Sequence, residues 1–186
     1  MSTAIRSKGI RAFIFNVWTP GEIDLTDGSV IKNIYLQYDQ YLDELLWLRK
    51  SDRRAIILSR DIVAGFRLFD SNDKLMATFA KKKVNLPFTG LKDAYLQVLM
   101  PGNPGFYVWR NSYVMASDNR LVERPRYLII AEGKDYPVRL SKRSLLNLTA
   151  IDKSKMKAIL HSERIMPQQD EQEFARAISR YNQLKK

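Results

Sequence analysis

The chain has 186 residues and carries 31 lysines and arginines against 20 aspartates and glutamates, which gives a formal net charge of +11. Its 45% apolar and 11% aromatic residues are typical of a folded single domain and too numerous for a disordered chain. Because the sequence has no cysteine and one histidine, it excludes disulfides, thiol nucleophiles, thiolate metal sites and any metal site that needs two histidines of one chain.

The first predicted elements in chain order are two strands joined by a tight turn. Residues 22–25 run into Asp27-Gly28, and an Asp-Gly pair favours the positive φ angles of a hairpin turn. In residues 30–38, apolar side chains mostly alternate with polar ones, although Lys32 interrupts the pattern. Such a period of two indicates a strand with one buried face.

Short β-branched or aromatic runs separated by turn residues continue up to about residue 140. Because no helical run lies between them, they predict antiparallel pairing rather than alternating strands and helices. The runs are residues 41–49, 55–58, 63–69, 95–100, 106–115 and 127–131. Residues 41–49 would also suit a short helix, and we assign them as a strand.

The spacing of apolar residues becomes helical after residue 140. Five apolar residues between positions 148 and 160 follow helical intervals, with Thr149 or Asp152 as the N-cap. A second helix is predicted to start at Asp170, because Glu171 and Glu173 place carboxylates at the positive end of the helix dipole. One apolar stripe then continues along this helix to residue 184.

These patterns predict an α+β fold that is mainly antiparallel β, arranged as a meander, a sandwich or a partly open barrel, with two C-terminal amphipathic helices. We expect residues 1–140 to form a β-rich body and residues 141–186 to form a helical appendage packed on it. Short amphipathic helices cannot bury their apolar stripes alone, so both parts would belong to a single structural domain.

No residue pattern in the sequence points to catalysis, since the phosphate-loop, dinucleotide and nucleophile-elbow motifs are missing. His161 is expected at a solvent-facing helix end. Adjacent Asp43 and Glu44 would point to opposite faces of a strand, whereas Glu22 and Asp24 would share one face. We therefore predict no enzyme, no catalytic residues, no cofactor and no metal, with a two-carboxylate hydrolase as the enzymatic alternative.

The basic residues indicate a second kind of surface. The densest run is Lys81-Lys82-Lys83, and a chain with this net charge attracts polyanions whether or not binding them is its function. The residues predicted to bind a polyanion are Lys81, Lys82, Lys83, Arg53, Arg54, Arg124 and Arg126.

The order of features along the chain resembles that of a known group of proteins. It begins with the aromatic-rich residues 13–18, continues with the strands on either side of Asp27-Gly28, and ends in a helix that carries Tyr181-Asn182. This order is similar to a family of uncharacterised exported β-rich proteins of the Bacteroidota, which have a strand, x-x-D-G, strand opening and a lysine-rich helical tail ending in Tyr-Asn. The resemblance implies an envelope location and a role as accessory to an outer-membrane assembly, and it supplies no catalytic residues.

The leading hypothesis is a non-enzymatic binding or assembly protein of the cell envelope that acts on a protein partner. The alternative is a nucleic-acid or polyanion-binding protein that uses its basic surface. The first ten residues contain no apolar stretch typical of a signal peptide, and no apolar run reaches the ~20 residues that span a bilayer. We expect a periplasmic or outer-membrane-associated protein if the chain is a mature form, and a cytoplasmic one if Met1 is the native start.

Overall fold

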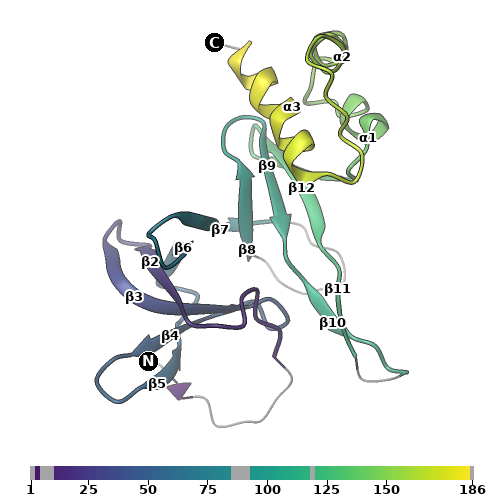
Figure 1. Cartoon of the computed structure of the whole chain (residues 1–186). Helices are drawn as coiled ribbons and strands as arrows, with labels where there is room; N and C mark the ends of the chain where they lie inside the picture. The colour runs from purple at the N-terminus through teal and green to yellow at the C-terminus, as the bar shows by residue number, and fades with distance from the viewer. Residues whose placement is uncertain (1–2, 5–10, 85–92, 118–119, 185–186) are drawn as a thin grey trace. The chain divides into compact units, whose positions relative to one another are not determined.

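The computed structural model describes residues 3–4, 11–84, 93–117 and 120–184 (Figure 1). It consists mostly of antiparallel strands, with three short helices towards the C-terminal end. The predicted β-rich α+β class is therefore confirmed. The signal-peptide prediction concerns the first ten residues, and all of these except Thr3 and Ala4 lie outside the described residues.

The chain forms two compact units, each with its own hydrophobic core. Unit 1 comprises Met1–Gln97 and Arg110–Pro125, and unit 2 comprises Val98–Trp109 and Arg126–Lys186. The chain passes from one unit to the other three times, first within strand β8 (Asp93–Met100).

Unit 1 is built from antiparallel strands in the order β1-β5-β4-β3-β2-β6-β7-β8. The order continues from β8 to β9, and the edge strands of the whole sheet are β1 and β13, so the described strands do not close into a barrel. The predicted turn joins β2 to β3, and Gly28 has a φ of 87° there. A separate hairpin of β10 (Ser112–Val114) and β11 (Leu121–Glu123) also belongs to this unit. The remaining bounds are β1 Thr3–Ala4, β2 Thr19–Leu25, β3 Val30–Asp39, β4 Glu44–Arg49, β5 Arg54–Ile57, β6 Val63–Phe69 and β7 Leu75–Lys83.

Aromatic side chains form the centre of the unit 1 core. Phe66 and Phe79 stack with 4.6 Å between their ring centroids, and Tyr38 lies 4.9 Å from Phe79. Tyr95 meets Phe66 edge-on at 5.4 Å. Each such pair adds about 0.5–1.5 kcal/mol beyond the area that it buries. The four rings therefore hold together strands β3, β6, β7 and β8.

Two predicted runs differ in detail from the structure. Residues 41–43 form a turn and the strand begins at Glu44, because the Asp39 carboxylate accepts the main-chain N–H groups of Tyr41 and Leu42 at 2.9 and 3.1 Å. The run 106–115 is divided into β9 (Gly105–Trp109) and β10, because β9 pairs with β12 whereas β10 pairs with β11.

Unit 2 combines a small antiparallel sheet with all three helices. Its strand order is β8-β9-β12-β13, where β8 contributes its last three residues, β12 is Arg126–Ala131 and β13 is Lys134–Val138. The helices are α1 (Lys142–Leu146), α2 (Lys153–Ser162) and α3 (Glu171–Gln183), and Figure 1 shows them gathered near one end of β9 and β12. Within the described residues, none of these helices is long and apolar enough to span a membrane.

Capping side chains set the helix boundaries. The Asp152 carboxylate accepts the N–H of Lys155 at 2.9 Å, so Asp152 rather than Thr149 is the N-cap of α2. Asp170 caps α3 as predicted. Such caps contribute about 1 kcal/mol each. The short helix α1 was not expected, because five residues are too few to show a helical period.

The helices of unit 2 pack on the strands of the same unit. The Phe174 ring of α3 lies 4.7 Å from the Phe106 ring of β9, and both side chains are fully buried. The buried stripe of α3 ends at Tyr181, while Leu184 is 64% exposed, so the predicted stripe is one position too long.

Two polar contacts attach the end of α3. The Tyr181 hydroxyl accepts the N–H of Asp152 at 2.9 Å, and the Asn182 side-chain amide donates to the carbonyl of Pro104 at 2.8 Å. In this chain, the Tyr-Asn pair therefore connects α3 to the start of α2 and to the turn between β8 and β9.

Candidate functional site

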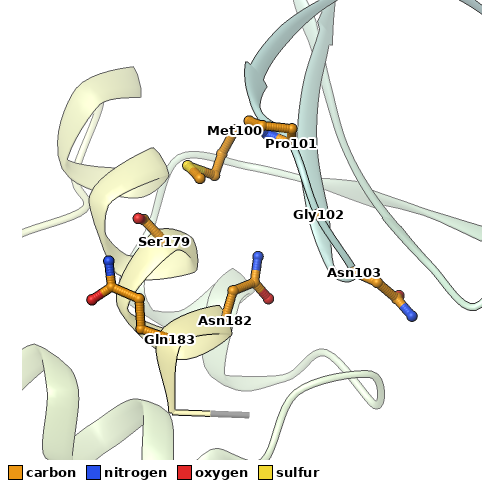
Figure 2. A pocket seen from close by; sticks show the side chains of 7 residues that line it. All are labelled: Met100, Pro101, Gly102, Asn103, Ser179, Asn182 and Gln183. Atoms are coloured by element: carbon orange, nitrogen blue, oxygen red, sulfur yellow. The ribbon is translucent and has the colours of Figure 1, made fainter. Parts of the chain in front are cut away.

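A cavity of about 470 Å³ lies in unit 2 beside the end of α3 (Figure 2). It offers amide and hydroxyl groups but no ionisable side chain. Asn103 points away from α3 in Figure 2, and its Oδ1 accepts the N–H of Glu132 at 2.9 Å. The cavity therefore supplies neither a general acid nor a general base. Its lining residues are Met100, Pro101, Gly102, Asn103, Ser179, Asn182 and Gln183.

The predicted basic run Lys81-Lys82-Lys83 does not form one exposed surface. Lys81 and Lys82 are partly buried, and the Lys81 Nζ donates to the main-chain carbonyl of Arg60. Lys83 is exposed. Because side chains alternate along a strand, neighbouring lysines of β7 point to opposite faces of the sheet. The sequence of three consecutive lysines does not show this until the segment is known to be a strand.

The predicted arginines lie on other elements. Arg53 is exposed in the turn between β4 and β5, and Arg54 is exposed at the start of β5, where its Nε lies 3.5 Å from the Asp52 carboxylate. Arg124 is exposed after β11, and Arg126 begins β12 with its guanidinium 5.8 Å from the ring centre of Trp109. Polyanion binding by this set stays a prediction.

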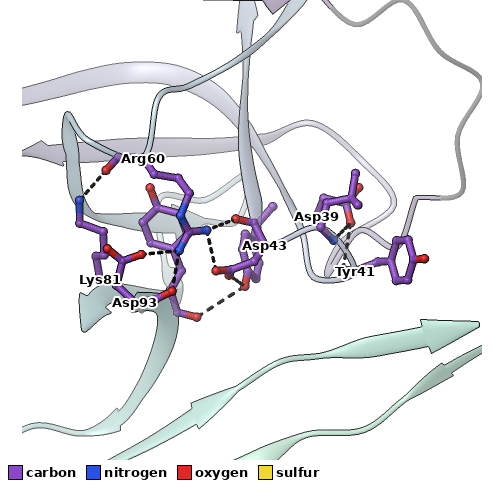
Figure 3. Close-up of polar contacts among 9 residues, drawn as sticks. Asp39, Tyr41, Asp43, Arg60, Lys81 and Asp93 are labelled. Carbon is purple, nitrogen blue, oxygen red and sulfur yellow. Dashed lines mark hydrogen bonds and ion pairs between the residues drawn. The ribbon is translucent and has the colours of Figure 1, made fainter. Parts of the chain in front are cut away.

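A cluster around Arg60 brings together charges from distant parts of unit 1 (Figure 3). Arg60 Nη1 donates to both the carbonyl and the Oδ2 of Asp43 at 2.6 Å, and Nη2 donates to the carbonyl and Oδ1 of Asp93 at 2.9 and 2.8 Å. The guanidinium also lies 4.9 Å from the ring centre of Tyr95, and the Tyr38 hydroxyl donates to Asp43 Oδ1. One arginine thus connects the β3–β4 turn to the start of β8.

Burial and charge act against each other in the Arg60 cluster. Burial raises the pKa of the Asp43 carboxyl above its usual value, and the Arg60 charge only partly opposes this. Burial would lower the pKa of Arg60, but the Asp43 and Asp93 carboxylates outweigh it and raise that pKa. Burial also raises the pKa values of the Tyr38 and Tyr95 hydroxyls. These shifts disfavour an ionised tyrosine and keep the arginine charged.

Two further arginines of unit 1 each contact two carboxylates. Arg67 donates to Glu22 at 3.0 Å and to Asp24 at 2.7 Å, so these carboxylates share one strand face as predicted. Arg11 donates to Asp39 at 3.1 Å and to Glu44 at 2.8 Å. Asp43 and Glu44 therefore contact different arginines and do not act as a pair.

Sequence reasoning missed the Arg60 cluster because its members carry no local signal. Asp43 and Asp93 lie 17 and 33 residues from Arg60 along the chain. His161 lies in the last turn of α2 and is exposed, as expected. Over residues 3–4, 11–84, 93–117 and 120–184, no group of three or more potential metal ligands is close enough to hold an ion.

A row of apolar side chains crosses unit 1 on the face of the strands opposite the core. Tyr35 pairs with Leu48 on one side and with Pro20 on the other, and Phe69 pairs with Leu75. The pairing of the preceding residues, Gly21 with Leu68, places Phe69 beside Pro20. We call the set Leu48, Tyr35, Pro20, Phe69, Leu75 and Met76 the apolar row.

Half of the apolar row is open to solvent. Tyr35 is 40% exposed, Leu75 is 50% exposed and Met76 is 40% exposed, and the other three members are partly buried. None of the six belongs to the unit 1 core. The alternation along β3 indicates that Tyr35 lies on the face opposite the core. Which side chains of the other four strands lie beside it depends on strand register, so the row could not be predicted from any single segment.

Comparison of the chain with protein-family models, with curated proteins and with solved structures finds no match.

Proposed function

We propose that this protein is a non-enzymatic binding protein of the cell envelope, accessory to an outer-membrane assembly, and that it contacts a protein partner through the apolar row. The row is the observation that carries the proposal, since adjacent apolar side chains that reach solvent inside a polar border typically mark interaction sites. Tyrosine, phenylalanine and methionine are also enriched at protein interfaces. The envelope part of the proposal rests on the resemblance in the order of sequence features.

The border of the row indicates the chemistry of the partner. Arg67 lies two residues before Phe69 on the same face, and its charge is compensated by Glu22 and Asp24. At the other side, the Lys50 Nζ lies 5.7 Å from the centre of the Tyr35 ring. A surface with this little uncompensated charge fits an apolar strip on a protein better than a polyanion.

The ion pairs of unit 1 support binding over hydrolysis. A two-carboxylate hydrolase needs one carboxyl group that donates a proton and one that activates water. Asp43 and Asp93 instead share the Arg60 guanidinium, which donates a charged hydrogen bond to one carboxylate oxygen of each. The arrangement favours a cross-link between segments rather than a reaction centre.

Site-specific photo-crosslinking in cells tests the proposal. A photoreactive residue at Leu75 should give one discrete protein adduct that persists in high salt, and Tyr35→Asp in the same chain should reduce it at least tenfold. The matched control places the photoreactive residue at Ile62, which is 48% exposed and lies outside the row. Equal adducts at both positions, or none at Leu75, would overturn the proposal, and an adduct of twice the chain mass would assign the row to self-association.

A further inference from the structure

The helical part of unit 2 carries a concentration of basic side chains that the protein-binding proposal does not use. Residues 139–164 contain seven lysines and arginines against two acidic residues. All seven basic residues are exposed. We call this set the α1–α2 basic surface, and its members are Arg139, Lys142, Arg143, Lys153, Lys155, Lys157 and Arg164.

The two acidic residues of this stretch already have other partners. The Asp152 carboxylate accepts the N–H of Lys155 as the N-cap of α2. Glu163 lies 2.8 Å from the Arg180 guanidinium and 3.6 Å from that of Arg176, both on α3. No ion pair among the described residues involves any of the seven basic side chains.

The helical geometry of α2 spreads its lysines over the solvent side. Met156, Ile159 and Leu160 are buried and fix the inward side of the helix. Lys153 and Lys157 are one turn apart along one flank of the outward side, and Lys155 lies on the other flank. Small or polar residues occupy the space between the two flanks, and the flexible lysine stems can extend from either flank towards the solvent side of the helix.

The side chains around these lysines favour lipid headgroups over nucleic acid. Proteins that bind single-stranded nucleic acid stack bases on exposed aromatic rings. The two aromatic residues between positions 139 and 184 are Phe174 and Tyr181, and both are buried. Met166, two residues after Arg164 in the segment that follows α2, is 70% exposed, and an exposed apolar side chain near basic ones is typical of segments that lie at membrane interfaces.

We infer that the α1–α2 basic surface docks the protein on an anionic membrane surface through lipid phosphate groups. Each lysine near such a surface strengthens binding about fivefold, and the effect is reduced by salt because it is electrostatic. This inference does not depend on the apolar row of unit 1, so either proposal can fail while the other holds.

Vesicle sedimentation with the full chain tests the inference. The protein should sediment with vesicles of phosphatidylglycerol and phosphatidylcholine in equal parts at low salt, and it should stay in solution with phosphatidylcholine alone. Replacing Lys153, Lys155 and Lys157 together by glutamine should weaken binding to the anionic vesicles about 100-fold, from the fivefold effect of each charge. Glutamine has nearly the helix propensity of lysine, and circular dichroism checks that α2 persists.

The matched control replaces Lys50, Lys74 and Lys134 by glutamine, which are exposed and lie outside the α1–α2 basic surface. This variant has the same net charge as the first and should bind anionic vesicles within about fivefold of the parent chain, because screening limits distant charges. Equal weakening in both variants, or no binding to anionic vesicles, would overturn the inference. Tighter binding to single-stranded or duplex DNA at equal phosphate concentration would assign the surface to nucleic acid instead.

Discussion

The two units of the molecule differ in whether their basic side chains form ion pairs. In unit 1, Arg11, Arg60 and Arg67 each contact two carboxylates, and Arg60 does so beside buried aromatic rings. In unit 2, the core between helices and strands is apolar, and the cations of α1 and α2 face solvent. A net charge of +11 therefore does not locate a binding surface, because the sum does not show which basic side chains form ion pairs, as the three arginines of unit 1 do, and which are left exposed.

The largest expected effect is on the paired charges of unit 1. Arg60→Met would leave the Asp43 carboxylate without its cation, and the Asp43 side chain is 2% exposed. We expect the free energy of unfolding to fall by about 3–5 kcal/mol in urea denaturation. The control Arg54→Met removes an arginine that is 69% exposed and should cost less than about 1 kcal/mol. Similar losses in both variants would show that the Arg60 cluster does not stabilise unit 1.

A comparable effect in unit 2 should come from an apolar residue. Phe174→Ala removes a fully buried ring in contact with Phe106, and we expect a loss of about 3–5 kcal/mol. Leu184→Ala, at a 64% exposed position of the same helix end, should change stability by less than about 0.5 kcal/mol. Hydrogen exchange should show faster exchange in β9, β12 and the helices for Phe174→Ala, and in the strands of unit 1 for Arg60→Met. Uniform acceleration along the chain in both variants would contradict the separation into two cores.

A smaller effect concerns the turn that α3 contacts. A Cβ on Gly102 would lie 2.7 Å from the Asn182 side-chain nitrogen, and its φ of 127° is unfavourable for alanine. Gly133 also has a positive φ, at 75°, but a Cβ there meets nothing within 4 Å. Gly133→Ala should therefore cost about 1–2 kcal/mol from backbone strain alone, and Gly102→Ala should cost more in thermal unfolding. Equal costs would mean that the contact with Asn182 adds no stability.

The smallest effect is a change in the dependence of stability on pH. Burial raises the pKa of Asp43 above 3.8, so the folded chain binds this proton more tightly than the unfolded chain does. Between pH 3.8 and the folded-state pKa, Asp43 therefore makes the free energy of unfolding decrease as pH rises, with a slope of at most about 1.4 kcal/mol for each pH unit. Asp43→Asn should remove this contribution in urea titrations between pH 4 and 8. An unchanged slope would show that the Asp43 pKa is not raised.

The sequence predicts those parts of the fold that depend on neighbouring residues. The Asp-Gly turn and the Asp170 cap are local signals that the structure confirms. The alternation in β3 holds from residue 34 onwards, whereas Val30, which it places on the buried face, is 43% exposed. The Arg60 cluster and the apolar row depend on strand register and on residues far apart in the chain, so no single segment contains them. The basic run at 81–83 fails as a prediction for a different reason. It is conspicuous in the sequence, but its side chains are divided between the two faces of β7.

The path of the chain between the two units constrains how the protein can be made and cut. Unit 1 requires residues 110–125, which are synthesised after the first segment of unit 2, and unit 2 requires α3 for its core. Neither unit can therefore be isolated as one continuous fragment. During synthesis, about 60 further residues are needed after β9, and about 40 after β12, before α3 can cover their apolar side chains, so this surface is open to aggregation in the meantime.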